Sequence, residues 1–364
     1  MHLEGLGYGT IFLLMAILLG CTKEVIVAQE IRIVDTVYVT DTKIYIDTVY
    51  VSDTVIQYKK KFDNPVIRQN TADPTVIRTE NGVFYLFSTE SATFPNIPIY
   101  KSIDLINWYF VGTAFNDTTR PTSFEGNLWA PDINYINGKY VLYYAMSKWG
   151  GEWNCGVGVA LADYPWGPFK EYAALFSSRQ IDVQNSIDPY YMEDDGKHYL
   201  FWGSHHGLYG IELSKDGLSL KSGAEKFQIA GNGGEGIYIH KHDGRYFLFQ
   251  SVGTCCNGLS STYNIRVGVA DDIHGPYFDR QNKSLMDGTG TLLLKGNSFV
   301  AGPGHNAEII TDDEGVDWLL YHGFLYSSPE TGRLLFLDKI SWDGGWPFIE
   351  SYGPSQSSEI PYFE

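Results

Sequence analysis

The sequence predicts an all-β protein, a five-bladed β-propeller preceded by a signal peptide and an extended repeat stalk. Aromatic residues make up 15% of the chain, including 26 tyrosines, and such side chains favour strands. A glycine turn followed by a strand of aromatic and aliphatic residues occurs five times after residue 63, in copies 48 to 71 residues apart. The turn glycines are Gly82, Gly138, Gly196, Gly244 and Gly315. Repeats of this length with several strands each are typical of propeller blades.

The composition excludes two classes of partner. The 26 basic and 43 acidic residues give a formal net charge of −17 over 364 residues. A chain with this charge does not bind nucleic-acid phosphates electrostatically, and it repels polyanions such as pectin backbones. With 44% hydrophobic and 19% charged residues, the composition is that of a folded protein. Four cysteines are too few for a disulfide scaffold in a chain of this length.

Residues 1–20 are interpreted as a signal peptide. The apolar run Ile11–Leu19 has the length of a signal-peptide core and is too short for a membrane helix, which needs about 20 residues. The following residues, Gly20 and Cys21, complete a segment that resembles a bacterial lipobox, in which the cysteine is lipidated. The alternative is a buried apolar strand that ends in an ordinary cysteine. We expect Cys21 to anchor the protein in the bacterial cell envelope, at the outer membrane.

Residues 21–62 are interpreted as the lipidated cysteine followed by an extended spacer. Asp-Thr pairs recur every six residues, and an even period indicates extended chain because a helix repeats every 3.6 residues. The aspartates are Asp35, Asp41, Asp47 and Asp53. The alternative is a pair of strands packed on the following domain. Three lysines at 59–61 mark the boundary, and residues 63–364 are expected to form the propeller domain.

One acidic or imidazole side chain precedes each turn glycine by six to ten residues. These residues are Asp73, Asp132, Asp188, Glu235 and His305. Because the innermost strand of a propeller blade begins at the central channel, the five side chains are expected to converge on one funnel. Several carboxylates in one cleft are costly as structure alone, so the cluster is a candidate functional site.

Each of these residues also has a structural interpretation. Asp73 and Asp188 precede proline, and Asp-Pro is a common turn pair. Asp132 follows a proline and fits a residue that fixes a turn. His305 fits a hydrogen-bonded core residue as well as it fits a ligand. The repeated placement favours function for Asp73, Asp188 and Glu235.

At these positions the sequence resembles glycoside hydrolase family 43, five-bladed propeller enzymes that cleave arabinan and xylan, and most closely its arabinanase branch. The resemblance covers about residues 65–350, and its segments are Ala72-Asp73-Pro74, Leu128–Ile133, Ile187-Asp188-Pro189, Gly234-Glu235-Gly236, Gly304-His305-Asn306 and Gly332–Asp338. It implies an inverting hydrolase of α-1,5-linked arabinan or arabino-oligosaccharide. In such an enzyme Asp73 would be the general base, Glu235 the general acid, and Asp188 the carboxylate that tunes and orients the acid.

The chemistry of inversion fits these roles. One carboxyl group protonates the leaving oxygen while a carboxylate activates water on the other face of the sugar, across a gap of roughly 6.5–9.5 Å. Asp73 must stay ionised, and Arg333 is a candidate donor to it. Arg333 fits equally well as a contact to a substrate hydroxyl or as a salt bridge within a blade. Sugars present apolar faces, so Phe94, Trp129 and Trp149 are expected to bind substrate by stacking, with burial in the core as the alternative.

The resemblance also implies one Ca²⁺ at the propeller centre, bound by His305 through water, and no organic cofactor. Cys255 and Cys256 are either free thiols or a disulfide between neighbours. Two other functions stay open. An exo-acting α-L-arabinofuranosidase or a β-xylosidase would use the same scaffold. A surface glycan-binding lipoprotein without activity is disfavoured because all three expected carboxylates are present.

Overall fold

The computed structural model describes residues 37–40 and 43–46, and the chain from residue 60 to residue 364. The two short segments, β1 (Val37–Thr40) and β2 (Lys43–Ile46), pair as an antiparallel hairpin. The predicted signal peptide, Cys21 and most of the predicted spacer lie outside the described residues. Residues Phe62–Glu364 form a separate compact unit. Within the described part of the chain, no helix is both long and apolar enough to cross a membrane.

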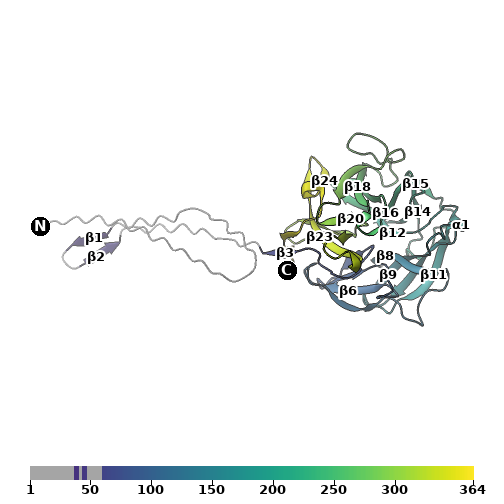
Figure 1. Ribbon diagram of the computed structural model, residues 1–364, viewed down its shortest axis with the longest axis horizontal. Helices are drawn as coiled ribbons and strands as arrows, with labels where there is room; N and C mark the ends of the chain where they lie inside the picture. The colour runs from purple at the N-terminus through teal and green to yellow at the C-terminus, as the bar shows by residue number, and fades with distance from the viewer. Residues whose placement is uncertain (1–36, 41–42, 47–59) are drawn as a thin grey trace. The chain divides into compact units, whose positions relative to one another are not determined.

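Five antiparallel sheets make up this unit, so the predicted five-bladed propeller is confirmed (Figure 1). The first two blades consist of β4 (Thr75–Arg78), β5 (Phe84–Phe87), β6 (Pro98–Ser102) and β7 (Tyr109–Thr113), then β8 (Asn127–Ile136), β9 (Lys139–Ser147), β10 (Gly156–Ala162) and β11 (Lys170–Ser177). The third blade consists of β12 (Tyr190–Asp194), β13 (Lys197–Trp202), β14 (Leu208–Glu212) and β15 (Phe227–Ala230).

The fourth blade consists of β16 (Gly234–His242), β17 (Arg245–Val252), β18 (Asn264–Ala270) and β19 (Thr291–Lys295). The fifth consists of β20 (Val300–Gly304), β21 (Ile309–Thr311), β22 (Asp317–Leu325), β23 (Arg333–Asp343) and β24 (Trp346–Phe348). Outside the blades, β3 (Lys61–Asp63) pairs with β25 (Ser357–Glu359). The helical turns are α1 (Ser178–Ile181), η1 (Gly258–Ser260), η2 (Pro329–Thr331) and η3 (Glu350–Tyr352).

All five predicted turn glycines lie in tight hairpins. Their φ angles are between 72° and 81°, in the left-handed region that favours glycine. In three hairpins the preceding residue, Asn137, Asp195 or Asp243, also has positive φ. Two such residues in a row form the turn that matches the twist of antiparallel strands, which is why Asn-Gly and Asp-Gly join the first two strands of these blades.

One apolar layer lies in each seam between neighbouring blades. Five clusters of buried side chains cover the five seams, and the one that joins the fifth blade to the first closes the ring. Central strands pack on both faces, so β22 is buried at all nine positions. Such strands show continuous apolar runs instead of the alternation of a half-exposed sheet.

The segment before the first blade is fixed to the last blade. The Asn64 side-chain amide donates to Leu337 O at 2.9 Å, and Leu337 N–H donates back to Asn64 Oδ1 at 3.0 Å. Further along, Thr71 N–H donates to Arg333 O at 2.7 Å. The chain therefore runs beside β23 and delivers Asp73 next to Arg333.

Candidate active site

The inner strand of each blade begins near one residue with left-handed backbone. These residues are Asp73 (φ 52°), Ala130 (40°), Asp188 (57°), Gly236 (59°) and His305 (46°). The register of β8 and β16 with their neighbours shifts around Ala130 and Gly236, and that of β20 shifts between Ala301 and Gly304, just before His305. The five blades are therefore equivalent at the channel. A non-glycine residue with positive φ is strained, and such strain gathers at functional sites.

Asp132 does not occupy the position in its blade that is equivalent to those of Asp73, Asp188 and His305. The residue of the second blade with left-handed backbone is Ala130, and Asp132 lies two positions further along β8. Its carboxylate accepts hydrogen bonds from Tyr191 N–H at 2.9 Å and from the Asn134 amide at 2.7 Å. Burial and the neighbouring Glu308 raise its pKa well above the usual range. Asp132 thus belongs to a buried acid pair with Glu308.

Asp73 is held as an anion by Arg333. The guanidinium Nη1 lies 3.0 Å from Asp73 Oδ1, and the Thr89 hydroxyl donates to Oδ2 at 2.6 Å. Burial by itself raises the pKa of this carboxyl, but Arg333 and the other neighbours outweigh it and hold the pKa well below the usual range. Of the three interpretations of Arg333, the structure therefore supports the donor to Asp73.

Two neutral histidines complete the surroundings of Asp73. His305 and His322 each place Nδ1 3.3 Å from Asp73 Oδ1, and burial lowers the pKa of both rings. The Asp73 N–H donates to His322 Nδ1 at 3.0 Å, so this nitrogen carries a lone pair and no proton. His322 is thus a hydrogen-bond acceptor and not a second cation, which leaves Arg333 as the charge that stabilises Asp73.

Glu235 is 7% exposed and is fixed from the third blade. The Ser204 hydroxyl donates to Glu235 Oε2 at 2.6 Å, and His205 Nε2 lies 3.3 Å from the same oxygen. The Tyr263 hydroxyl also interacts with this carboxyl group. Glu235 therefore has polar partners at a position that is otherwise closed to solvent.

Asp188 interacts electrostatically with both Glu235 and Asp73. Its Oδ2 accepts a hydrogen bond from Gly236 N–H, the residue after Glu235, at 3.1 Å. Burial, the charge of Glu235 and the charge of Asp73 raise the pKa of Asp188 well above the usual range. Because three close carboxylates resist simultaneous ionisation, this side of the site retains a proton at a pH where ordinary carboxyl groups have lost theirs.

Gly236 is required between Glu235 and the fifth blade. Its φ is 59°, and a Cβ atom there would lie 3.0 Å from Cγ of His305. A side chain at this position would be strained and would displace the histidine. The group that approaches this glycine closely is the His305 ring.

The predicted stacking residues differ in exposure. Trp149 is 77% exposed, and its ring centroid lies 5.6 Å from that of half-buried Trp129. Phe94 is half-buried and contacts the rings of Tyr100 and Phe110 at centroid distances of 6.4 and 5.4 Å. Trp149 therefore offers the open aromatic face, whereas Trp129 and Phe94 also support the fold.

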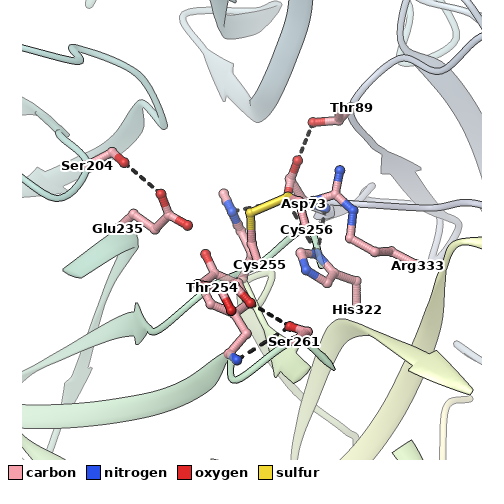
Figure 2. The surroundings of a disulfide bond; sticks show 12 residues. Asp73, Thr89, Ser204, Glu235, Thr254, Cys255, Cys256, Ser261, His322 and Arg333 are labelled. Carbon is pink, nitrogen blue, oxygen red and sulfur yellow. Dashed lines mark hydrogen bonds and ion pairs between the residues drawn. A yellow bond between two sulfur atoms is a disulfide. The ribbon is translucent and has the colours of Figure 1, made fainter. Parts of the chain in front are cut away.

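Cys255 and Cys256 form a disulfide in the loop between β17 and β18, which settles the alternative that the sequence left open. In the view of Figure 2 it lies between Glu235 and Asp73. The Ser261 hydroxyl donates to Thr254 O and ties the two sides of this loop together. Cys155 is free and buried.

The polar partners of the carboxylates escaped sequence reasoning. Thr89, Ser204 and His322 hold Asp73 and Glu235, yet none was a candidate. A signal was present, because the repeated strands end in serine in four copies: Ser88, Ser147, Ser204 and Ser251. The second strand of each blade runs antiparallel to the first, so its end lies beside the start of the inner strand.

Comparison with known proteins agrees with this geometry. Residues 62–347 match the glycosyl hydrolases family 43. The chain belongs to that family. It is therefore a glycoside hydrolase, and the propeller fold and the family resemblance predicted from the sequence are confirmed.

The relatives are similar over most of their length. The chain is 34% identical over 311 residues to an extracellular exo-α-(1→5)-L-arabinofuranosidase of Cellvibrio japonicus, covering 76% of this chain and 86% of the relative. It is 33% identical over 291 residues to an extracellular endo-α-(1→5)-L-arabinanase of Bacillus subtilis, with the same coverage. A solved Cellvibrio cellulosa α-L-arabinanase in complex with arabinohexaose matches with a TM-score of 0.69 and 30% identity, over 79% of this chain and 99% of that one.

The first prediction concerns the ion pair of Asp73. In Arg333→Met the pKa of Asp73 rises, so the acidic limb of the kcat/KM profile moves to higher pH. Wild-type Asp73 has a folded-state pKa below its unfolded value, so the pair stabilises the fold at neutral pH and this contribution disappears as pH falls through the folded pKa. Breaking a buried pair costs about 3–5 kcal/mol, and the difference in Tm between wild type and variant is expected to narrow below about pH 4.

The matched control is Arg266→Met. Arg266 is part-buried and donates to Asn264 Oδ1 and Gly290 O, away from any carboxylate named above. This variant should leave the acidic limb where it is. If the acidic limb of the kcat/KM profile stays at the same pH in Arg333→Met, the assignment of Arg333 as the group that keeps Asp73 ionised is contradicted.

Proposed function

We propose that this protein hydrolyses α-1,5-linked L-arabinan with inversion of configuration, by endo-acting cleavage. The observation that carries the proposal is that three carboxyl groups in one buried site have different electrostatic surroundings. Arg333 keeps Asp73 ionised, while the surroundings of Asp188 retain a proton. A base and an acid at the same pH are what glycosidic cleavage by inversion needs.

In the proposed mechanism Asp73 accepts a proton from water as the water attacks the anomeric carbon. Glu235 donates a proton to the glycosidic oxygen as that bond breaks, and Ser204 fixes the orientation of its carboxyl group. Asp188 positions the acid through its hydrogen bond from Gly236 N–H. After the step Asp73 holds a proton and Glu235 has lost one, and exchange with solvent restores both.

The substrate assignment is supported by the relatives and by the charge of the chain. Both curated relatives are named for action on α-1,5-linked arabinose polymers. Arabinan is neutral, so a net charge of −17 does not oppose its approach. Trp149 offers an exposed ring on which the apolar face of a sugar stacks, with Trp129 beside it, and Phe94 is proposed as a further contact.

The calcium ion implied by the family resemblance has limited support in these residues. Ca²⁺ takes six to eight oxygen ligands. His305 offers nitrogen, and its Nδ1 faces Asp73. Next to it, Asn306 Oδ1 is a buried oxygen without a hydrogen-bond partner in the described structure. A cation here would be held mainly by water, so calcium stays a prediction of the resemblance and no step of the mechanism passes through it.

The substrate and the mode of cleavage are tested together with linear arabinan. We expect a rapid fall in viscosity and a ladder of arabino-oligosaccharides, because an endo-acting enzyme cuts within the chain. Release of a single small product from the start would indicate the exo-acting alternative, which the Cellvibrio relative favours. Hydrolysis of xylan or of an aryl xyloside in preference to arabinan would contradict the substrate assignment.

The roles of the two carboxyl groups are tested by leaving-group dependence. Glu235→Ala is expected to lose about 10²–10⁴-fold on arabinan and much less on an arabinofuranoside with an acidic phenol, because that group departs with little protonation. Asp73→Ala is expected to lose a comparable factor on both, since every substrate needs activated water. Asp188→Ala should fall between them. NMR of the first-formed product should show inverted configuration, and retention would overturn Asp73 as the base.

We further propose that Cys21 carries the lipid anchor and that residues 22–62 space the propeller from the outer membrane. The lipobox-like segment and the six-residue repeat support this proposal. In a bacterial host that processes lipoproteins, the full chain should fractionate with membranes and Cys21→Ala should not. Equal distribution of the two proteins between membrane and soluble fractions would refute the anchor.

A further inference from the structure

We propose that His240, His242 and Asp317 form a binding site for a divalent transition-metal ion at the seam between the fourth and fifth blades. Each residue offers one ligand atom, and these atoms all lie within 4.8 Å of one another. Both histidines are half-buried and Asp317 is buried. No other part of the proposed function uses these three residues.

The strand geometry brings the three side chains together. His240 and His242 are two residues apart in β16, so they project from the same face of the strand. Asp317 is the first residue of β22 in the next blade. An ion at this point would join two blades whose ligands are 75 residues apart, from 242 to 317. The link is comparable to a crosslink between blades.

Neighbouring side chains fix the direction of each ligand. The Tyr238 hydroxyl lies 3.2 Å from His240 Nδ1, which leaves Nε2 for a metal. His242 stacks flat on Trp342, with ring centroids 3.6 Å apart and planes within 2°. Metal sites in proteins have such outer partners, which set the orientation of the ligands.

Asp317 is held in the same way. The Thr311 hydroxyl donates to Oδ1 at 2.6 Å, and Trp342 Nε1–H donates to Oδ2 at 2.7 Å. Each carboxylate oxygen has two acceptor positions, so one hydrogen bond leaves room for a metal on either oxygen. Trp342 therefore supports two ligands at once, by stacking on His242 and by donating to Asp317.

The donor set selects the class of metal. Two imidazole nitrogens and one carboxylate oxygen suit Zn²⁺, Co²⁺ or Ni²⁺, whereas Ca²⁺ prefers oxygen alone. Bond lengths near 2.0–2.2 Å place the ligand atoms of a tetrahedral site roughly 3.4 Å apart. The ligand atoms therefore move together by up to about 1.4 Å around the ion, and water fills the fourth position.

The site lies apart from the catalytic carboxylates. Glu235 is near the start of β16 and His240 is five residues further along, which is about 17 Å on an extended strand. Metal binding is therefore expected to change stability and not the chemistry at Glu235. The proposed metal site and the proposed hydrolysis of arabinan can therefore be refuted independently of each other.

The test is a titration of the full chain, freed of metal with a chelator, using Co²⁺ as an optical probe and Zn²⁺ as competitor. We expect 1:1 binding, visible absorption bands of tetrahedral Co²⁺ that Zn²⁺ abolishes, and a rise of several degrees in Tm at saturating Zn²⁺. Absence of saturable 1:1 binding in the wild-type chain would overturn the proposal, whatever the variants do.

Two variants locate the ion. His242→Phe keeps a ring on Trp342 but removes the ligand, and His240→Asn keeps a polar group near Tyr238. Each should weaken Co²⁺ binding at least about tenfold and abolish the rise in Tm, with hydrolysis of arabinan unchanged. His274→Asn is the control, because His274 is exposed and paired with Asp272 at 2.7 Å. Unchanged affinity in both variants would place the ion elsewhere and refute the site.

Discussion

The left-handed residue at the start of each inner strand is the constraint on which the active site depends. It turns the chain sharply at the channel in every blade, and in three blades it turns Asp73, Asp188 or His305 toward the same axis. Such a conformation costs a non-glycine residue roughly 1–2 kcal/mol. Proline follows Asp73, Ala130 and Asp188, and it disfavours a right-handed helical conformation at each of them. The apolar layers of the five seams hold the ring together against this local strain.

The active site also depends on electrostatic interactions, because they distinguish carboxyl groups whose backbone conformations are alike. Asp73 and Asp188 have similar backbone angles and both precede proline, yet their pKa values move in opposite directions. The difference comes from Arg333, which reaches Asp73 because residues 64–73 run beside β23. The buried pair Asp132 and Glu308 is stabilised without a cation. Thr75 and Val76 donate to Glu308 at 2.6 and 2.7 Å, and burial raises the pKa of both acids, so a proton and hydrogen bonds replace a cation.

Sequence patterns predicted the architecture because each blade repeats a local rule. Glycine turns, four of them Asn-Gly or Asp-Gly, fix hairpins without reference to distant residues, so five copies gave five blades. The candidates at Asp73, Asp188 and Glu235 followed from counting back from those turns. The same counting misplaced Asp132, because β8 has ten residues and its bulge lies between Trp129 and Asp132. The contact between Asp73 and Arg333 joins residues 260 positions apart, and no local pattern encodes it. Likewise, the open alternatives for Cys255 and Cys256 differ only in loop geometry.

The loops at the rim of the channel are held in a different way from its floor, which the starts of the inner strands form. Glu90 accepts a bidentate pair of hydrogen bonds from Arg120 at 2.6 and 2.7 Å, and it also accepts from Asn96 N–H and Leu128 N–H. Arg120 reaches Asn96 Oδ1 and Gly126 O as well, so one ion pair fastens the long connection that carries Phe94 to the start of β8. The floor is therefore determined by repeated backbone geometry, whereas this part of the rim is determined by individual side-chain contacts. Because endo cleavage requires a polymer to extend past the site on both sides, the rim and not the floor is the part of the channel that bears on the mode of cleavage.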